Sequence, residues 1–341
     1  MSNFMEKNTE FNKTLNNKDN FNDNFNDTFN DNLNNINNND NDNFKDNNEI
    51  NKMNTELFEN YICSDKLKFY NKFDDEELNI KDNILKGIFS YGFERPSPIQ
   101  RIAIKPLMEK KDIVIQSHSG TGKTATFIIG LLSNIDEKLK STQAIVICNT
   151  RELALQTLKV FESLSNYTEI NSKLCIGGDM QFKYSAENIS NHVIIGTPGR
   201  LCDLISKKII NTENVKLLVI DEADDVLSTG FRKQVKKIFN NIPKNSQVAL
   251  VSATIPQEMS NLFDEILKPD FISILIKDDQ LTLEGINQYY INLDEQYKFD
   301  TVIDLYQFIN VGQGIIYCNK KTKADELKLI LEEKDFSVGT L

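Results

Sequence analysis

The sequence lacks any long hydrophobic run. Nowhere do 18 apolar residues stand together, whereas a helix that crosses a membrane needs about 20. The first residues are polar and acidic, so they resemble neither the apolar core of a secretory signal nor an Arg-rich transit peptide. We therefore expect no membrane segment and no targeting peptide.

Cysteine is scarce and forms no pattern. The five cysteines contain no Cys-x-x-Cys pair and are odd in number; they are Cys63, Cys148, Cys175, Cys202 and Cys318. This usage is typical of a reduced compartment. We expect the cytoplasm, with the nucleus as the alternative, and cysteines that serve as small buried apolar side chains.

An excess of positive charge is also missing, which at first argues against a nucleic-acid partner. The net charge is −11, but residues 1–60 hold twelve Asp or Glu against five Lys or Arg and account for −7 of it. The remaining 281 residues carry only −4. A local basic track on the folded part of the chain is therefore compatible with the composition.

Residues 1–60 form a low-complexity tail, in which Asn occupies 20 of the first 50 positions. Such a segment buries too little apolar surface to offset the entropy of ordering, so we expect disorder. One repeat spaces Phe21, Phe25, Phe29 and Leu33 four residues apart, which would form an apolar stripe on a partner-binding helix. Because Asn and Asp are poor helix formers, compositional drift in a solvated tail is the favoured interpretation.

Residues 70–275 alternate short apolar runs with helical patterns. This predicts an α/β fold with a parallel sheet covered by helices on both faces. The predicted strands are 112–116, 144–149, 172–177, 192–197, 216–221 and 248–253; predicted helices include 124–132, 152–166 and 231–242. The motifs SHSGTGKT, TPGR, DEAD and SAT each follow or end such a strand. We expect them at one edge of the sheet, where ligands of parallel sheets bind.

Residues 285–341 begin a second unit of the same kind, after a linker at 276–284. Predicted strands lie at 285–293, 313–318 and 336–341, with predicted helices at 297–310 and 321–334. These 57 residues are fewer than an ordinary domain holds. We expect three strands and two helices to leave core faces uncovered.

The run SHSGTGKT at 117–124 has the form of a phosphate-binding loop between a strand and a helix. Gly120 and Gly122 permit the tight turn that aims backbone N–H groups at phosphate. Lys123 can reach the β- and γ-phosphates, and the Thr124 hydroxyl can ligate Mg²⁺. Since Ser117 replaces the usual first glycine, this run alone leaves a plain turn as the alternative.

The run LLVIDEAD at 217–224 predicts a buried strand that ends in carboxylates. Asp221 offers one carboxylate to a metal ion, and Glu222 offers a second to an attacking water. Together with the glycine loop, this pair predicts a site that binds and splits a nucleoside triphosphate.

In this order, the motifs resemble those of the DEAD-box RNA helicases, more narrowly translation initiation factor 4A and its exon-junction relative. The resemblance runs from Phe73 to Leu341 and includes at least eight motifs. It implies a RecA-like ATP-binding domain at 70–275 and a truncated start of a second RecA-like domain at 285–341. It also implies ATP, Mg²⁺, single-stranded RNA or mRNA gripped by its backbone, and a monomer.

The resemblance implies the residues that hold ATP. In GFERPSPIQ (92–100), Gln100 would pair with adenine and Phe93 would stack on it, with Phe73 as the upstream aromatic. A helix cap around Pro96 and Ser97 is the plainer interpretation of this segment. The phosphates would meet Ser117, His118, Ser119, Gly120, Thr121, Gly122, Lys123 and Thr124, of which His118 occupies a variable position without a catalytic role.

The resemblance also implies catalytic roles. Asp221 would hold Mg²⁺ through water, with Thr124 as the other metal ligand, and Glu222 would orient and deprotonate the attacking water. Asp224 would hydrogen-bond the SAT motif and couple hydrolysis to RNA. The catalytic candidates are Lys123, Asp221, Glu222, Asp224, Ser252 and Thr254. Alternatively, Ser252 and Thr254 cap the helix that starts near Pro256.

Three loops resemble the RNA-binding segments of the family: NTRELALQ (149–156), the glycine pair at 177–178 and TPGR (197–200). Asn149 stands where the family has Pro, which loosens one loop but removes no donor. The candidates are Thr150, Arg151, Glu152, Gly177, Gly178, Thr197, Pro198, Gly199 and Arg200. Backbone contacts of this kind are independent of base sequence. Taken alone, TPGR is equally compatible with a plain turn.

The sequence departs from the family pattern at its end, because the HRxGRxxR motif does not appear. One of its arginines acts on the γ-phosphate, and such residues contribute roughly 10³–10⁵ in rate. Two interpretations therefore compete: a portion of an RNA-stimulated ATPase that unwinds short duplexes, and a catalytically incompetent binder of nucleotide, RNA or partner. The uncovered sheet favours the first, with weak ATP binding and little RNA-stimulated hydrolysis by this chain.

Other features narrow the function without deciding the pathway. A GTP switch is disfavoured because NKKT at 319–322 lacks the Asp of a guanine-reading NKxD motif, whereas Gln100 suits adenine. The resemblance allows a translation-initiation scaffold or exon-junction proteins as partners, and the sequence does not separate the two.

Overall fold

A computed structural model of the chain describes residues 61–65, 67–178, 189–228, 230–277, 287–309 and 312–340. The predicted tail, with its Phe repeat, and most of the predicted linker lie outside these residues. Tertiary contacts divide the chain into residues 1–282 and 283–341, and each unit is taken by itself below. Among the described helices, none has the length and apolar character to cross a membrane.

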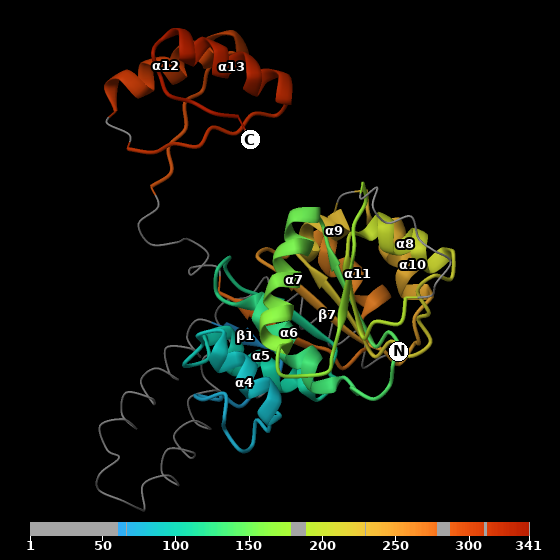
Figure 1. Cartoon of the computed structure of the whole chain (residues 1–341). Coiled ribbons are helices and arrows are strands. Elements are labelled where there is room, and N and C mark those ends of the chain that lie inside the picture. Colours follow the sequence, from blue (N-terminus) through green and yellow to red (C-terminus); the bar gives the residue numbers. More distant parts are fainter. Residues whose placement is uncertain are drawn as a thin grey trace, which may run out of the picture. The chain divides into compact units, whose positions relative to one another are not determined.

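Within the described residues, the first unit is built on an eight-stranded sheet (Figure 1) in the order β1-β8-β2-β7-β6-β3-β5-β4. Strands β2 to β8 pair in parallel, and β1 runs antiparallel to β8. The strands are β1 (Tyr61–Cys63), β2 (Ile113–Gln116), β3 (Ala144–Cys148), β4 (Ser172–Cys175), β5 (Val193–Gly196), β6 (Leu217–Asp221), β7 (Gln247–Ser252) and β8 (Ile272–Ile276).

Helices cover both faces of this sheet. One face packs on α4 (Asp82–Ser90), α5 (Pro98–Met108), α6 (Lys123–Asn134) and α7 (Arg151–Ser165). The other packs on α8 (Pro198–Ser206), α9 (Ala223–Ser228), α10 (Arg232–Asn240) and α11 (Gln257–Ile266). Alternate residues of β3 divide between the two cores, since Val146 lies in the first and Ile145 and Ile147 in the second. A strand with both faces buried therefore appears as a continuous apolar run.

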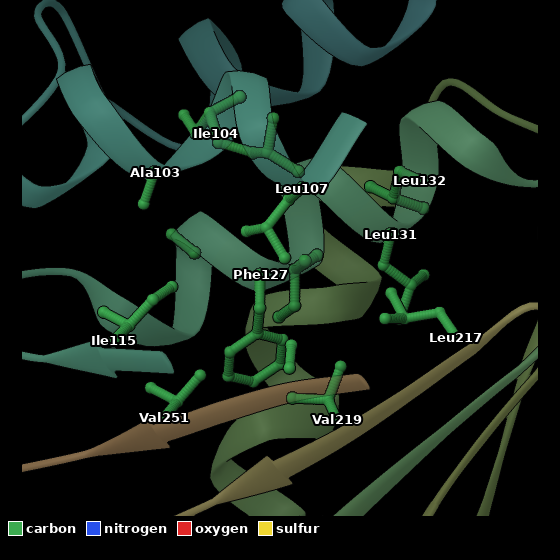
Figure 2. Packing of buried hydrophobic residues seen from close by; sticks show 14 of the residues in the cluster. Ala103, Ile104, Leu107, Ile115, Phe127, Leu131, Leu132, Leu217, Val219 and Val251 are labelled. Carbon is green, nitrogen blue, oxygen red and sulfur yellow. The ribbon is translucent and has the colours of Figure 1, made fainter. Parts of the chain in front are cut away.

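Figure 2 shows the first core where α6 meets the sheet. Phe127 points from α6 toward Val219 of β6 and Val251 of β7, with Leu107 of α5 above it. All four side chains are almost completely buried. This packing holds α6, whose first residue is Lys123, at a set position above the sheet.

The prediction of an α/β fold is confirmed, and its six strands are present as β2 to β7 with ends shifted by one or two residues. Two strands were not predicted. β1 precedes the predicted range 70–275, and its three residues are too few to show a period. β8 reaches Ile276, the first residue of the predicted linker.

In the second unit, the two predicted helices are confirmed as α12 (Lys298–Phe308) and α13 (Lys321–Glu333), with the short 3₁₀ turn η2 (Glu295–Tyr297) before them. They pack through Ile303, Leu327 and Leu331. The predicted strands are wrong for the described stretches 287–293, 313–318 and 336–340, which form no ladder. A strand requires a hydrogen-bonded neighbour, which these described segments lack. Tyr289 and Tyr317 are 90% exposed, whereas Cys318, Phe336 and Val338 are partly buried against α12 and α13.

The five cysteines are free thiols. Cys148 and Cys175 are buried, as predicted, whereas the other three are half-buried. Burial raises the pKa of the Cys148 thiol to about 12, so this side chain stays protonated and packs as a small apolar group.

Candidate nucleotide site and RNA groove

The predicted nucleotide motifs meet at the carboxyl edge of three adjacent strands. The phosphate loop follows β2, the SAT motif ends β7 and the DEAD motif ends β6, and β7 pairs with both of the others. The backbone N–H of Ser117 donates to the carbonyl of Ser252 across 3.2 Å. The loop and the SAT motif are thus held together directly, and the site lies where parallel sheets bind ligands.

The phosphate loop turns through glycines that adopt left-handed backbone angles. Gly120 has φ 81° and Gly122 has φ 92°. A Cβ at Gly122 would lie 2.6 Å from Nε2 of Gln100, so a side chain at this position would displace the Gln100 amide. The turn leads directly into α6 at Lys123, and the first N–H groups of that helix form a natural anion site.

Lys123 is tethered to the loop that precedes it. Its Nζ donates to the carbonyls of Ser117 (2.6 Å) and His118 (2.9 Å), and the residue is 7% exposed. Burial lowers the pKa of Lys123, and the carboxylates of Glu222, Asp221 and Asp224 oppose that shift. The ammonium therefore sits among three acidic groups, at the end of a loop suited to phosphate.

Asp221 has the chemistry of a cation ligand. It is 2% exposed, its Oδ1 accepts the backbone N–H of Glu222 at 3.1 Å, and its Oδ2 is buried without a hydrogen-bond partner. Burial, followed by repulsion from Glu222, raises the pKa of Asp221 to about 7. In the described part of the chain, no three His, Cys, Asp or Glu side chains form a metal cage. Mg²⁺ held by one or two protein oxygens plus nucleotide fits this arrangement.

Glu222 occupies a strained backbone position. Its φ is 49°, which is uncommon for a residue with a side chain, and it turns the chain from β6 into α9. Burial raises the pKa of Glu222, and Lys123 partly offsets the effect. A carboxylate whose pKa is raised accepts a proton more readily, as a general base must.

Asp224 makes the predicted contact with the SAT motif. The Thr254 hydroxyl donates to the Asp224 carboxylate, and the Asp224 backbone N–H donates to Oγ of Ser252 at 3.4 Å. Helix α11 begins after Pro256 without a side-chain cap, so the capping alternative for Ser252 and Thr254 is wrong.

In the predicted adenine motif, the Gln100 amide is bonded within the protein and the Phe73 ring is buried. Gln100 is 2% exposed; its Oε1 accepts the Ser97 N–H at 2.8 Å, and its Nε2 donates to the Gly122 carbonyl at 3.4 Å. The helix-cap interpretation is therefore correct, and the same amide also touches the phosphate loop. Phe93 is half-buried, whereas Phe73 is fully buried with its ring centroid 6.3 Å from that of Phe93.

The burial of Phe73 corrects its predicted position beside the base. A ring that solvent does not reach has no free face for stacking, and the apolar core around α4 and α5 encloses it. In this structure, Phe73 packs in the core with its ring tilted by 31° against that of Phe93.

The three predicted RNA loops line one groove of about 500 Å³. Its walls include seven of the nine predicted residues, namely Thr150, Arg151, Glu152, Gly177, Thr197, Gly199 and Arg200. A Cβ at Gly178 would lie 2.6 Å from Nη1 of Arg151, so this glycine leaves room for the guanidinium. Pro198 is buried as the first residue of α8, and TPGR is therefore a helix start rather than a plain turn.

Two features of the groove were not predicted from the sequence. Phe231, just before α10, joins its lining. Asn149 donates through Nδ2 to the carboxylate of Asp225 at 2.9 Å, which connects the groove to the residue that follows the DEAD motif. No local pattern marks either contact, because Asn149 and Asp225 lie 76 residues apart and Phe231 lies outside all three predicted loops.

Comparison with known proteins places these motifs in a family. Residues 97–262 match the DEAD/DEAH box helicase family. The chain is 46% identical over 289 residues to the ATP-dependent RNA helicase eIF4A of Kluyveromyces lactis, covering 84% of this chain and 72% of that protein. It is 43% identical over 268 residues to the eIF4A of Schizosaccharomyces pombe, covering 78% and 68%.

Solved structures agree. S. cerevisiae Dbp5 bound to RNA and ADP BeF3 is similar with a TM-score of 0.70 and 31% identity, covering 80% of this chain and 69% of that one. A DEAD box protein from the hyperthermophile Methanococcus jannaschii is similar with a TM-score of 0.56 and 34% identity, covering 80% and 73%.

Proposed function

The chain belongs to the DEAD/DEAH box helicase family, and we propose how its residues divide the work of an ATP-dependent RNA helicase. The predicted family is confirmed, and with it the prediction of an ATP-dependent RNA helicase, which is the name that the eIF4A relatives carry. The weak hydrolysis expected of this chain stays a prediction. The assignments of single residues, the metal ion and the cellular role are proposals. They rest on the geometry of the phosphate loop, the carboxylates and the groove.

ATP binds with its phosphates in the loop at 117–124. The N–H groups at the start of α6 and the Lys123 ammonium neutralise the β- and γ-phosphates. Lys123 makes room by exchanging the carbonyls of Ser117 and His118, its present partners, for phosphate oxygens. Gln100 contacts this loop at Gly122, and Gln100 and Phe93 are proposed to meet the adenine.

Thr124 and Asp221 are proposed to hold Mg²⁺, which when bound draws charge from the phosphates. Support comes from the unpartnered Oδ2 of Asp221. Glu222 then takes the proton of the attacking water, as its raised pKa favours. The contact of Asp224 with Ser252 and Thr254 holds the DEAD and SAT motifs in register and is proposed to transmit the state of the ATP site.

Single-stranded RNA is proposed to lie in the groove. Arg151 and Arg200 supply cationic donors, and the N-termini of α7 and α8 supply backbone N–H groups, all of which suit phosphate oxygens. Phe231 adds an apolar wall against which a sugar or base can rest. Contacts of this kind grip the backbone and do not select a base sequence.

We propose a role in translation initiation in the cytoplasm, as a monomer that acts on mRNA beside a scaffold partner; the eIF4A relatives support the translation role. A nuclear, exon-junction role is the alternative. The chain is proposed to comprise a RecA-like ATP-binding domain at 70–275, a linker at 276–284 and a second RecA-like domain beginning at 285. The change of tertiary contacts between residues 282 and 283 supports this division. β1 adds Tyr61–Cys63 to the sheet of the first domain.

The observation that carries the proposal is that the phosphate loop, the DEAD carboxylates and the SAT motif share one sheet edge. The hydrogen bond between Asn149 and Asp225 connects this edge to the groove. The test is binding of a fluorescent N-methylanthraniloyl ATP with Mg²⁺ or with EDTA, and anisotropy of a labelled single-stranded RNA. We expect Lys123→Ala to lose nucleotide but not RNA, and Arg151→Ala the reverse. Equal loss of both ligands in both variants would refute two distinct sites.

A further inference from the structure

Three hydroxyl groups form a series of hydrogen bonds that ends in the phosphate loop, buried at Tyr61 and Ser117 and partly buried at Thr121. The Tyr61 hydroxyl lies 3.0 Å from Oγ of Ser117, which donates to Oγ1 of Thr121 at 2.9 Å. The Thr121 hydroxyl then donates to the carbonyl of His118 at 2.8 Å. That carbonyl also accepts the ammonium of Lys123 at 2.9 Å. These hydrogen bonds therefore connect strand β1 to the His118 carbonyl, which holds Lys123.

The donor and acceptor in each of these hydrogen bonds follow from counting the hydroxyl hydrogens. A serine hydroxyl has one hydrogen, and Ser117 uses it toward Thr121. Tyr61 must therefore donate to Ser117. Burial raises the pKa of Tyr61 above its ordinary value of 10.0, so the phenol stays protonated, and remains a donor, throughout the physiological range.

The sheet register explains why these residues meet. Tyr61 pairs with Ile276 at the carboxyl end of β8, while Ile274 of the same strand pairs with Ile115 of β2. Two residues further on, Ser117 is level with Ile276. Tyr61 and Ser117 therefore flank Ile276 from opposite sides, and the tyrosine side chain is long enough to reach across the end of β8.

Ser117 itself creates the need for a partner. It occupies the position of the first glycine in the general phosphate-loop pattern, and its hydroxyl is fully buried. A buried hydroxyl that lacks a hydrogen bond is costly. Tyr61 and Thr121 together satisfy it, and each contact also fixes the path of the loop between Ser117 and Thr121.

We propose that Tyr61 is a positioning residue for nucleotide binding, which holds the phosphate loop in its binding shape through Ser117 and Thr121. The inference rests on the proposed ATP site and adds to it a residue from an edge strand outside every motif. Tyr61 touches no phosphate in this scheme. Its effect is on the population of the loop conformation that accepts ATP, so it changes affinity rather than chemistry.

The test is a double-mutant cycle on the 341-residue chain, with the affinity for N-methylanthraniloyl ATP and Mg²⁺ as the readout. Tyr61→Phe removes the hydroxyl and keeps the ring. We expect it to weaken binding about three- to tenfold, the equivalent of one hydrogen bond. Ser117→Ala should weaken it similarly. Because both changes break the same chain, the double variant should be little worse than either single variant.

Tyr70→Phe is the matched control, since Tyr70 is 5% exposed in the same core cluster as Tyr61. It should leave the affinity unchanged. If Tyr61 had only a structural role, Tyr61→Phe would lower the melting temperature of the nucleotide-free protein and leave its affinity for N-methylanthraniloyl ATP unchanged. That result would overturn the inference. So would fully additive effects in the double variant. If the unaltered chain binds no nucleotide, the proposed ATP site fails instead, which separates the two conclusions.

Discussion

Replacing Asp221 with asparagine should make the folded protein more stable while removing its magnesium-dependent hold on ATP. Asp221 lies at the end of β6 and is 2% exposed, with one carboxylate oxygen unpartnered. The ionised form therefore pays for desolvation without a compensating contact. Asparagine keeps the acceptor for the Glu222 N–H and carries no charge.

The magnitude follows from the raised pKa. A rise from 3.8 to about 7 corresponds to roughly 4 kcal/mol, at about 1.4 kcal/mol per pH unit. Between about pH 4 and pH 7 the folded protein keeps this proton while the unfolded chain has lost it. The contribution of Asp221 to stability therefore declines as the pH rises through this window and is constant above it.

The assay is urea unfolding in EDTA from pH 4 to pH 8, with the difference in unfolding free energy between Asp221→Asn and the unaltered chain as the quantity of interest. That difference should be near zero at pH 4 and should approach roughly 4 kcal/mol in favour of the variant at pH 8. Asp270→Asn is the control for loss of a carboxylate, because Asp270 is exposed and paired with Lys111. It should not reproduce the gain in stability that Asp221→Asn shows at pH 8.

Two results would refute this reasoning. A stability difference that is the same at pH 4 and pH 8 would mean that Asp221 does not titrate in this window. Tight magnesium-dependent ATP binding by Asp221→Asn would mean that the carboxylate is not the metal ligand. Adding Mg²⁺ and ATP at pH 8 should stabilise the unaltered chain but not the variant.

Three further predictions concern catalysis and RNA. Glu222→Gln should slow ATP hydrolysis at least about 100-fold, as loss of a general base does, yet leave nucleotide affinity within about threefold. Single-turnover hydrolysis with enzyme in excess measures the rate. Retained turnover would show that another group is the base. Asn149→Ala should remove the hydrogen bond to Asp225 and weaken single-stranded RNA binding about three- to tenfold without changing ATP affinity. Anisotropy that matches the unaltered chain would show that this hydrogen bond does not contribute to RNA binding. Arg151→Ala should lower the slope of log RNA affinity against log salt concentration by about 0.7. Lys159→Ala, on the same helix but outside the groove, should leave the slope unchanged. An identical slope for both variants would mean that RNA does not bind in this groove.

Much of the first unit was predictable from its sequence. Strand β3 is a continuous apolar run of five residues, and β6 is four apolar residues that end in Asp221. Each leads directly into a polar motif, so both the element and its functional end appear in the local pattern. The glycines and Lys123 of the phosphate loop are equally local. β1 could not be found in this way, because three residues show no period and its pairing partner, β8, lies more than 200 residues away.

The second unit shows the opposite case. The segments at 285–293 and 313–318 have the apolar composition of strands, yet their described residues form none, and Tyr290 is 93% exposed. Composition indicates that a segment is able to pair as a strand. Pairing also needs a neighbouring strand in register and apolar contacts that cover one face. The helices α12 and α13 were predictable because their hydrogen bonds are internal to each segment.

By itself, the sequence determined the fold class, the order of the motifs and the family, because these depend on residues that stand next to one another. Tertiary structure alone decided that the segments at 149–152, 177 and 197–200 share a groove with Phe231, that Phe73 is buried next to Phe93, and that Tyr61 reaches the phosphate loop. The reason lies in the strand order, in which β3 sits between β5 and β6, and β8 between β1 and β2. Neighbours across a sheet are set by this order, which no local spacing of residues records.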